Sequence, residues 1–350
     1  MHHSSNGFKA MFAGVALAFA CVFGMNSGAS AQAPTELRIL VFGGTLGAGF
    51  MKAISGFEKE NNVKFVVTDS TSVQGLTRLL ARRGQEPEWD IAHMSPSAHF
   101  QGVEAGLWEE LSPKLVPAMG EVIPFAVDRG KYPGWGVLAF GLQVNTEALK
   151  KAGVAEPTSW KDLWKPEYKS RIAINDFANA YAQAFLDMVA QIEGSQEAAF
   201  AALKRLQPNV SRFPFTPAEL DNLLLQSEVW VAPNSDSRAN LLSKKGAPIK
   251  FIHPSEGSGA WLVHLDIPKG ARNRDLAIKL VNYVLRADTQ ARLAVSAQVG
   301  PVHPKAVLTA AEAQGITHGD GLKKLRPLRW DQIVPKLNAL HDRWNREFQK

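Results

Sequence analysis

Short apolar runs and amphipathic stretches alternate along most of the chain. The run at 37–43 (LRILVFG) has the composition of a buried strand, and apolar residues in the stretch after it recur at the spacing of one helix face. The same two patterns predict strands at 37–43, 63–68, 89–94, 171–175, 229–232 and 249–252. They predict a helix that Thr45 can cap, helices through 76–80 and 277–284, and helices at 180–192, 196–206, 217–226 and 235–244. This alternation is typical of an α/β fold.

Two longer extended stretches interrupt the alternation, at 132–145 (YPGWGVLAFGLQVN) and at 260–268 (AWLVHLDIP). Each is too long for a tight turn, and a complete set of strands and helices lies between them. We interpret them as two crossings between two lobes, which implies a hinge and a cleft. The predicted boundaries are 37–138 plus 262–315 for lobe 1, 139–261 for lobe 2, and 316–350 for C-terminal helices that pack across the lobes.

The first 31 residues differ from the rest. Lys9 precedes an uncharged, mostly apolar run at 11–24, and Ala29-Ser30-Ala31 has the small residues of a cleavage site, which together predict a secretory signal peptide at 1–31. Cleavage after Ala33 is the alternative, but it would place Pro34 directly behind the cut. A transmembrane anchor needs about 20 apolar residues, so this run is too short for one.

The only cysteine of the chain, Cys21, lies inside this segment. Ala18 stands where a lipoprotein signal usually has a larger aliphatic residue, so we expect cleavage and export rather than lipid anchoring at Cys21. A product without thiols suits an oxidising compartment. The net charge is +6, from 39 Lys+Arg against 33 Asp+Glu, and it is spread thinly. We therefore expect no nucleic-acid partner.

Two candidate contacts lie in lobe 1, where predicted strands end and helices begin. Gly44 and Thr45 sit at such a junction, where free backbone N–H groups and the helix dipole favour an anionic or polar ligand group. The alternative is that the glycines only permit the turn. Ser95 follows the third strand in the same way, and it either faces a ligand or caps the next helix. No complete G-x-G-x-x-G or Walker A pattern is present, so we expect no nucleotide cofactor.

Lobe 2 repeats this arrangement twice. Asn179 stands at the start of one helix, and Asn234 and Ser237 flank the start of another. Asp236 is most simply a helix cap. Arg238 lies in the first turn of the same helix, where the helix dipole disfavours a cation. A guanidinium in that place suits a carboxylate or phosphonate, so Arg238 is a candidate anion clamp.

The second crossing adds Glu256 and Trp261, separated by a flexible Gly-Ser-Gly turn. The indole of Trp261 either covers a ligand or packs the hinge.

Enzymatic patterns are weak. The histidines show no close metal-binding spacing, and Gly257-Ser258-Gly259 is not a nucleophile elbow. We therefore expect neither a metal site nor any other cofactor. A secreted α/β hydrolase is the alternative from another class. The four tyrosines are isolated in the sequence, which argues against a ferric-ion carrier.

Several segments resemble the bacterial extracellular solute-binding proteins of ABC importers, in the branch of the spermidine/putrescine-binding proteins. The segments are 141–145, 157–174 (PTSWKDLWKPEYKSRIAI), 246–257 (GAPIKFIHPSEG), 267–271 (IPKGA) and 330–348. The resemblance implies the type II periplasmic binding fold, with two α/β lobes that close over a solute by a hinge. It implies a protein without catalysis that acts as a monomer and delivers a small solute to an inner-membrane permease.

Carried over by position, the ligand site would use Gly44, Thr45, Ser95, Asn179, residues 234–238 (with Asn234, Ser237 and Arg238) and Trp261, with Gln298 as a further candidate. Glu256 joins the predicted site from the second crossing. The chain departs from the polyamine pattern, because Trp261-Leu262-Val263 stands where polyamine binders resemble one another in W-x-D. Losing that carboxylate would cost an amine its charge-assisted hydrogen bond, worth about 1.5–3 kcal/mol. We therefore expect a small anionic or zwitterionic organic solute, with a polyamine as the alternative.

Overall fold

The computed structural model describes residues 33–349, and the strands and helices of these residues belong to one compact unit that begins at Pro34. The expected signal peptide at 1–31, including Cys21, lies outside the described residues. Among the helices that the structure describes, none has the length and apolar character needed to cross a bilayer.

Strands and helices alternate along the described chain. The strands are β1 (Thr35–Phe42), β2 (Val63–Ser70), β3 (Ile91–Met94), β4 (Val127–Asp128), β5 (Tyr132–Asn145), β6 (Ile172–Ala173), β7 (Val210–Arg212), β8 (Val231–Ser235), β9 (Ile249–Ile252), β10 (Gly259–Asp266) and β11 (Arg326–Pro327). The α-helices are α1 (Thr45–Asn61), α2 (Ser72–Ala81), α3 (Pro96–Glu104), α4 (Thr146–Ala152), α5 (Ala180–Glu193), α6 (Gln196–Leu206), α7 (Pro217–Leu225), α8 (Asp236–Ser243), α9 (Arg274–Val284), α10 (Ala287–Ala297), α11 (Ala310–Ala313), α12 (Trp330–Ile333) and α13 (Leu337–Glu347). Short 3₁₀ helices are η1 (Pro117–Gly120), η2 (Pro124–Ala126), η3 (Trp160–Trp164), η4 (Pro166–Tyr168), η5 (Gln207–Asn209), η6 (Gly319–Lys324) and η7 (Val334–Lys336).

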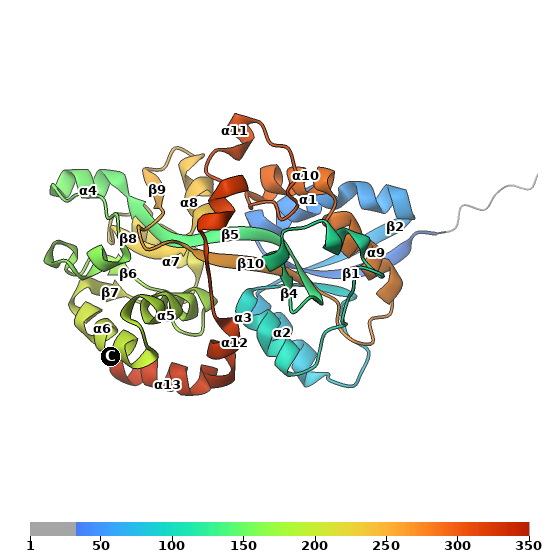
Figure 1. The fold of residues 1–350 in the computed structure, drawn as a ribbon, viewed down its shortest axis with the longest axis horizontal. Helices are drawn as coiled ribbons and strands as arrows, with labels where there is room; N and C mark the ends of the chain where they lie inside the picture. The colour runs from blue at the N-terminus through green and yellow to red at the C-terminus, as the bar shows by residue number, and fades with distance from the viewer. Residues whose placement is uncertain (1–32, 350) are drawn as a thin grey trace, which may run out of the picture. The chain divides into compact units, whose positions relative to one another are not determined.

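The strands form one mixed sheet in the order β2-β1-β3-β10-β5-β8-β6-β7. Strands β2, β1 and β3 are parallel to one another, and β8, β6 and β7 form a second parallel group. The long strands β10 and β5 run antiparallel between the two groups and join them, as Figure 1 shows. All 14 residues of β5 are buried, as expected of a strand covered on both faces.

The first helix illustrates how the local sequence forms these elements. Helix α1 buries Phe50, Ala53, Ile54 and Phe57 on one face, where Phe50 contacts His93 of β3 and Trp135 of β5, and the helix also packs against α10. The expected cap is wrong, because the capping position is Gly44, at φ 76°, and Thr45 is already the first helical residue. Glycine enters this left-handed region at low cost because it has no Cβ.

Most predicted boundaries agree with the structure. Strands β5 and β9 and helix α6 coincide residue for residue with the prediction. Strand β6 covers only two residues of the predicted 171–175, and β8 is shifted toward its C-terminus, so it ends at Ser235. The sequence pattern did not predict the two- and three-residue strands β4, β7 and β11.

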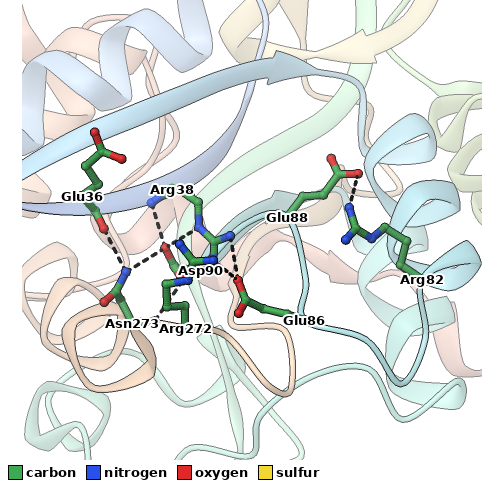
Figure 2. A network of polar contacts seen from close by, with 8 residues as sticks. All are labelled: Glu36, Arg38, Arg82, Glu86, Glu88, Asp90, Arg272 and Asn273. Atoms are coloured by element: carbon green, nitrogen blue, oxygen red, sulfur yellow. Dashed lines mark hydrogen bonds and ion pairs between the residues drawn. The ribbon is translucent and has the colours of Figure 1, made fainter.

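A buried carboxylate holds one end of the first parallel group together (Figure 2). The side chain of Asp90 is fully buried, and it accepts hydrogen bonds from the backbone N of Arg38 (2.9 Å), from Arg38 Nη2 (2.9 Å) and from the backbone N of Asn273 (3.0 Å). Burial acts to raise the pKa of Asp90, but the bonds from Arg38 and Asn273 outweigh it and hold the pKa below its usual range. The contacts tie β1 to the chain before β3 and to the start of α9.

Candidate ligand site

Tyr181 at the start of α5 contacts both Ser235 at the end of β8 and Trp261 in β10. The Tyr181 hydroxyl donates to Ser235 Oγ at 3.1 Å, and the centroids of the Trp261 and Tyr181 rings lie 4.5 Å apart. Burial raises the pKa of Tyr181, so its hydroxyl remains a neutral donor. The sequence pattern pointed to Trp261 but left Tyr181 as an isolated tyrosine; its place in the first turn of a helix after a strand was the available signal.

Arg238, the predicted anion clamp, lies in the first turn of α8 and is not a free cation. Its Nη2 forms an ion pair with Asp221 of α7. Burial raises the pKa of Asp221, although the Arg238 charge opposes that rise. The Nε of Arg238 is buried and has no hydrogen-bond partner among the described residues. One donor of the guanidinium is therefore left unpaired and buried beside the ion pair with Asp221.

Two further carboxylates of the predicted lobe 2 already accept hydrogen bonds from the protein. Asp236 is 3% exposed and accepts from Thr317 Oγ1 (2.6 Å) and the backbone N of Ala139 (3.0 Å). Burial raises its pKa to about 6. Asp176 accepts from the backbone N of Ala178 (2.9 Å) and from Gln349 Nε2 (2.8 Å). Each of these carboxylates therefore has a structural role through its hydrogen bonds within the protein.

The structure gives several predicted ligand residues a contact within the protein. Asn179 caps α5 by accepting from the backbone N of Tyr181 at 3.0 Å. Asn234 is fully buried and donates to Gln143 Oε1 at 2.6 Å. Ser237 is also buried, and its backbone N donates to Asp236 Oδ1 at 2.8 Å.

Glu256 and Gln298 are likewise engaged. Glu256 accepts from Ser159 Oγ (2.5 Å) and the backbone N of Trp160 (3.1 Å), so its carboxylate fixes the start of η3. The Oε1 atom of Gln298 accepts from Asn240 Nδ2 and Lys244 Nζ of α8, both at 2.5 Å.

The predicted ligand residues of lobe 1 make no contact with the Tyr181 group among the contacts of the described residues. Gly44 and Thr45 are exposed, and a Cβ placed on Gly44 would meet open space. Ser95 is half-buried at the start of α3; its side chain does not cap the helix, and its backbone N donates to Ser72 Oγ at 2.9 Å. The structure therefore brings Trp261 and Arg238 to the Tyr181 region, but it shows no contact of Gly44, Thr45 or Ser95 with them.

A cavity of about 1050 Å³ adjoins this region. Its walls come from the start of α3, residues 123–129, strand β10, residues 301–306 and residues 318–331. None of the nine predicted ligand residues lines it. The connection is aromatic, because Trp330 lines the cavity and lies edge-on to Trp261 with ring centroids 5.7 Å apart.

One lining residue of the cavity, His264, belongs to a histidine pair that the sequence pattern did not reveal. The His99 and His264 rings stack at 3.6 Å with planes 2° apart, and His99 Nδ1 lies 2.9 Å from Asp266 Oδ2. Burial opposes a charge on His99, but Asp266 and Asp128 raise its pKa to about 9. His99, His264 and Asp266 are close enough to suggest a metal site. However, the lone pairs of two parallel stacked rings do not converge on one ion, so this geometry does not fit a metal.

A sequence model of the family described as bacterial extracellular solute-binding protein matches residues 89–324. This chain belongs to that family. It is 30% identical over 254 residues to spermidine/putrescine-binding periplasmic protein 1 of Haemophilus influenzae, covering 69% of this chain and 68% of that protein. It is 23% identical over 298 residues to a γ-aminobutyric acid-binding protein of Pseudomonas aeruginosa, covering 81% of each.

Solved structures agree with the family. The chain superposes on the crystal structure of an ABC transporter protein from Clostridium perfringens with a TM-score of 0.76 and 26% identity, covering 89% of this chain and 99% of that one. The predicted fold is confirmed: the solute-binding protein has the two-lobed α/β architecture of type II periplasmic binding proteins. The protein is a solute-binding component of the ABC transporter family, whose members bind small solutes outside the cytoplasm and work with permeases.

Proposed function

We propose that this solute-binding protein captures a small organic anion or zwitterion between its lobes in the periplasm and delivers it, as a monomer, to an inner-membrane ABC permease. The proposal rests on which charged groups of lobe 2 already have a partner. Asp176, Asp221 and Asp236 all have partners within the protein, whereas Arg238 Nε has none among the described residues.

A polyamine is the alternative, and the Haemophilus influenzae relative is named for polyamines. A polyamine is an extended polycation, and each ammonium needs a carboxylate to replace its hydration. In this chain the position two residues after Trp261 is Val263, which is buried and apolar. An anionic group instead gains the Arg238 donor and the N-terminal ends of helices. The Pseudomonas aeruginosa relative is named for a zwitterionic amino acid, which agrees with this class.

We further propose the lobe boundaries as 37–138 plus 262–315 and 139–261, with the C-terminal residues 316–350 packing across the lobes. Two contacts support that path. The backbone N and Nε of Arg329 donate to Asp187 of α5 at 3.0 and 2.8 Å, while the following helix α12 packs against α3. In this arrangement Gly44, Thr45 and Ser95 approach the solute from lobe 1 when the lobes close, because a ligand that bridges both lobes stabilises the closed state.

A thermal-shift screen of the mature protein tests the solute class. The panel contains aliphatic carboxylates, alkylphosphonates, ω-amino acids and the polyamines putrescine and spermidine. A ligand present at 100 times its Kd stabilises the folded protein by about 2.7 kcal/mol. We expect at least one anionic or zwitterionic compound to raise Tm, and stabilisation by polyamines alone would refute the proposal.

A further inference from the structure

The cavity beside Trp330 has stiff walls. Five of its lining residues are prolines, whose rings fix the backbone angle φ and limit movement of the wall: Pro96, Pro124, Pro301, Pro304 and Pro327. Each wall segment except β10 contains at least one of these prolines, and β10 is held within the sheet. A cavity built in this way is preformed and does not depend on a ligand to open it.

The volume and the aromatic lining indicate the size and shape of a ligand. Small-molecule pockets commonly measure about 300–1,000 Å³, so a cavity of about 1050 Å³ accommodates more than a short aliphatic acid. Phe100, Phe125 and Trp330 line it together with Leu262 and Leu328. Aromatic faces set among prolines and leucines favour a flat, apolar ring system.

Arg129 and Lys323 on the walls each pair with a neighbouring carboxylate, whereas Asp331, which also lines the cavity, has no partner among the described residues. Arg129 Nε lies 3.7 Å from Asp128 Oδ2, and Lys323 Nζ lies 2.7 Å from Asp320 Oδ1. An anionic group in the body of the cavity would have to break these pairs to gain a cation. The paired cations and the apolar lining therefore disfavour a negatively charged body.

One buried polar group on the wall also lacks a partner. His264 is 1% exposed, lines the cavity, and its Nδ1 is buried without a hydrogen-bond partner among the described residues. The ring cannot turn freely, because it is stacked on His99, which Asp266 and Asp128 hold from both edges. Burial and the nearby His99 charge lower the pKa of His264 well below its usual value, so the imidazole is neutral. An unsatisfied buried nitrogen costs stability, and a ligand group that bonds to this ring recovers it.

We propose that this cavity binds a ring-bearing, largely uncharged organic group that sets one polar substituent against the His264 imidazole. The group is either the body of the transported solute or a separate ligand. Both sources share the same chemistry, and the test distinguishes them through Arg238, which belongs to the proposed solute site and not to the cavity lining.

The test compares matched compounds that differ by a ring: indole-3-acetate against acetate, and benzylphosphonate against methylphosphonate. Binding is measured by isothermal titration calorimetry on the mature protein. A buried ring removes about 150–250 Å² from water, and we expect the ring-bearing member of at least one pair to bind about tenfold or more tightly.

Two variants then place the ring in the cavity. Ala260→Phe inserts a side chain from β10 into the cavity, and His264→Phe keeps the stack on His99 while it removes both ring nitrogens. We expect each to weaken the ring-bearing compound by about tenfold, equivalent to about 1.4 kcal/mol, with little effect on the acetate or methylphosphonate partner. His341→Phe is the control, because His341 lies on α13 against Phe177 and outside the cavity lining.

The variant Arg238→Gln shows whether the ring-bearing group is part of the transported solute or a separate ligand. If it weakens the same ring-bearing compound, the ring belongs to the transported solute; if it does not, the cavity holds a separate ligand. Either result supports a ring-binding cavity. The proposal is overturned if no ring-bearing compound binds more tightly than its partner, or if binding is unchanged in both Ala260→Phe and His264→Phe. Unchanged far-UV circular dichroism confirms that each variant is folded.

Discussion

His99 and His264 stack with ring centroids 3.6 Å apart, yet their pKa values shift in opposite directions. Asp266 and Asp128 raise the pKa of His99 to about 9, whereas burial and the His99 charge push the pKa of His264 down. The pair is therefore one imidazolium and one neutral imidazole at pH 7. This arrangement fixes β10 to α3 and leaves His264 as a neutral polar group of the cavity wall.

Removing the charged ring should destabilise the protein. His99→Leu leaves the buried Asp266 carboxylate without its cationic partner, and breaking a buried pair in this way costs about 3–5 kcal/mol. Urea unfolding at pH 7 measures the loss. The double variant His99→Leu/Asp266→Leu should recover part of it, because it leaves no unpaired charge. A single variant as stable as the parent would show that the pair contributes nothing.

The same pair predicts a pH dependence. A histidine whose folded pKa is raised stabilises the protein fully below its unfolded pKa of 6.5, and this contribution declines as pH rises toward about 9. Tyr132, whose ring faces His99, has a pKa raised by burial and therefore stays neutral across this window. The free energy of unfolding of the parent, measured against that of His99→Gln at pH 6, 7.5 and 9, should show a shrinking advantage. A constant difference across that range would contradict the prediction.

Asp90 should give the opposite pH dependence. Asp90→Asn weakens the bonds from Arg38 and Asn273, and hydrogen bonds to a charged group contribute about 1.5–3 kcal/mol. Because the folded pKa of Asp90 is lowered, its contribution is present above the unfolded value of 3.8 and is lost as pH falls through the folded value. Chemical unfolding at pH 7 and pH 3 checks both claims. Equal stability of the parent and the variant at pH 7 would refute the structural role.

A variant of Glu256 tests whether this predicted ligand residue has a structural role instead. Its carboxylate holds Ser159 and the backbone N of Trp160 at the start of η3, so Glu256→Ala should cost about 1 kcal/mol of stability, as a lost helix cap does. Affinity for any solute found in the screen should stay within about twofold, a difference of less than about 0.5 kcal/mol. A large loss of affinity without a loss of stability would instead return Glu256 to the ligand site.

Local patterns were sufficient to predict most of the fold. The apolar runs at 132–145 and 249–252 correspond to β5 and β9, because a run of consecutive apolar residues is a local signal of a buried strand. The strand β6 falls short of its predicted length because it pairs only at Ile172 and Ala173, with a register irregularity against β7 between them. Tertiary pairing, which a single sequence does not display, decides such lengths.

The contacts of the candidate site residues were predicted less completely, for a physical reason. Arg238 and Trp261 follow from helix starts and crossings, which are local features. The ion-pair partner of Arg238, Asp221, lies 17 positions away on another helix, and His99 and Asp266 are 167 positions apart. Contacts of this kind depend on how elements pack, so sequence spacing gave no sign of them. Asn234 was selected for its place after a strand, whereas packing encloses it completely.

The most direct measurement is the affinity of the best compound of the screen for the parent, for Arg238→Gln and for Arg212→Gln, by isothermal titration calorimetry. Arg212 is an exposed arginine paired with Glu228 and serves as the matched control. Hydrogen bonds to a charged group contribute about 1.5–3 kcal/mol, so Arg238→Gln should weaken an anionic or zwitterionic solute by about tenfold or more. The control should bind as the parent does. If putrescine or spermidine binds tightest and Arg238→Gln leaves that affinity unchanged or improves it, the assignment of the solute class is wrong.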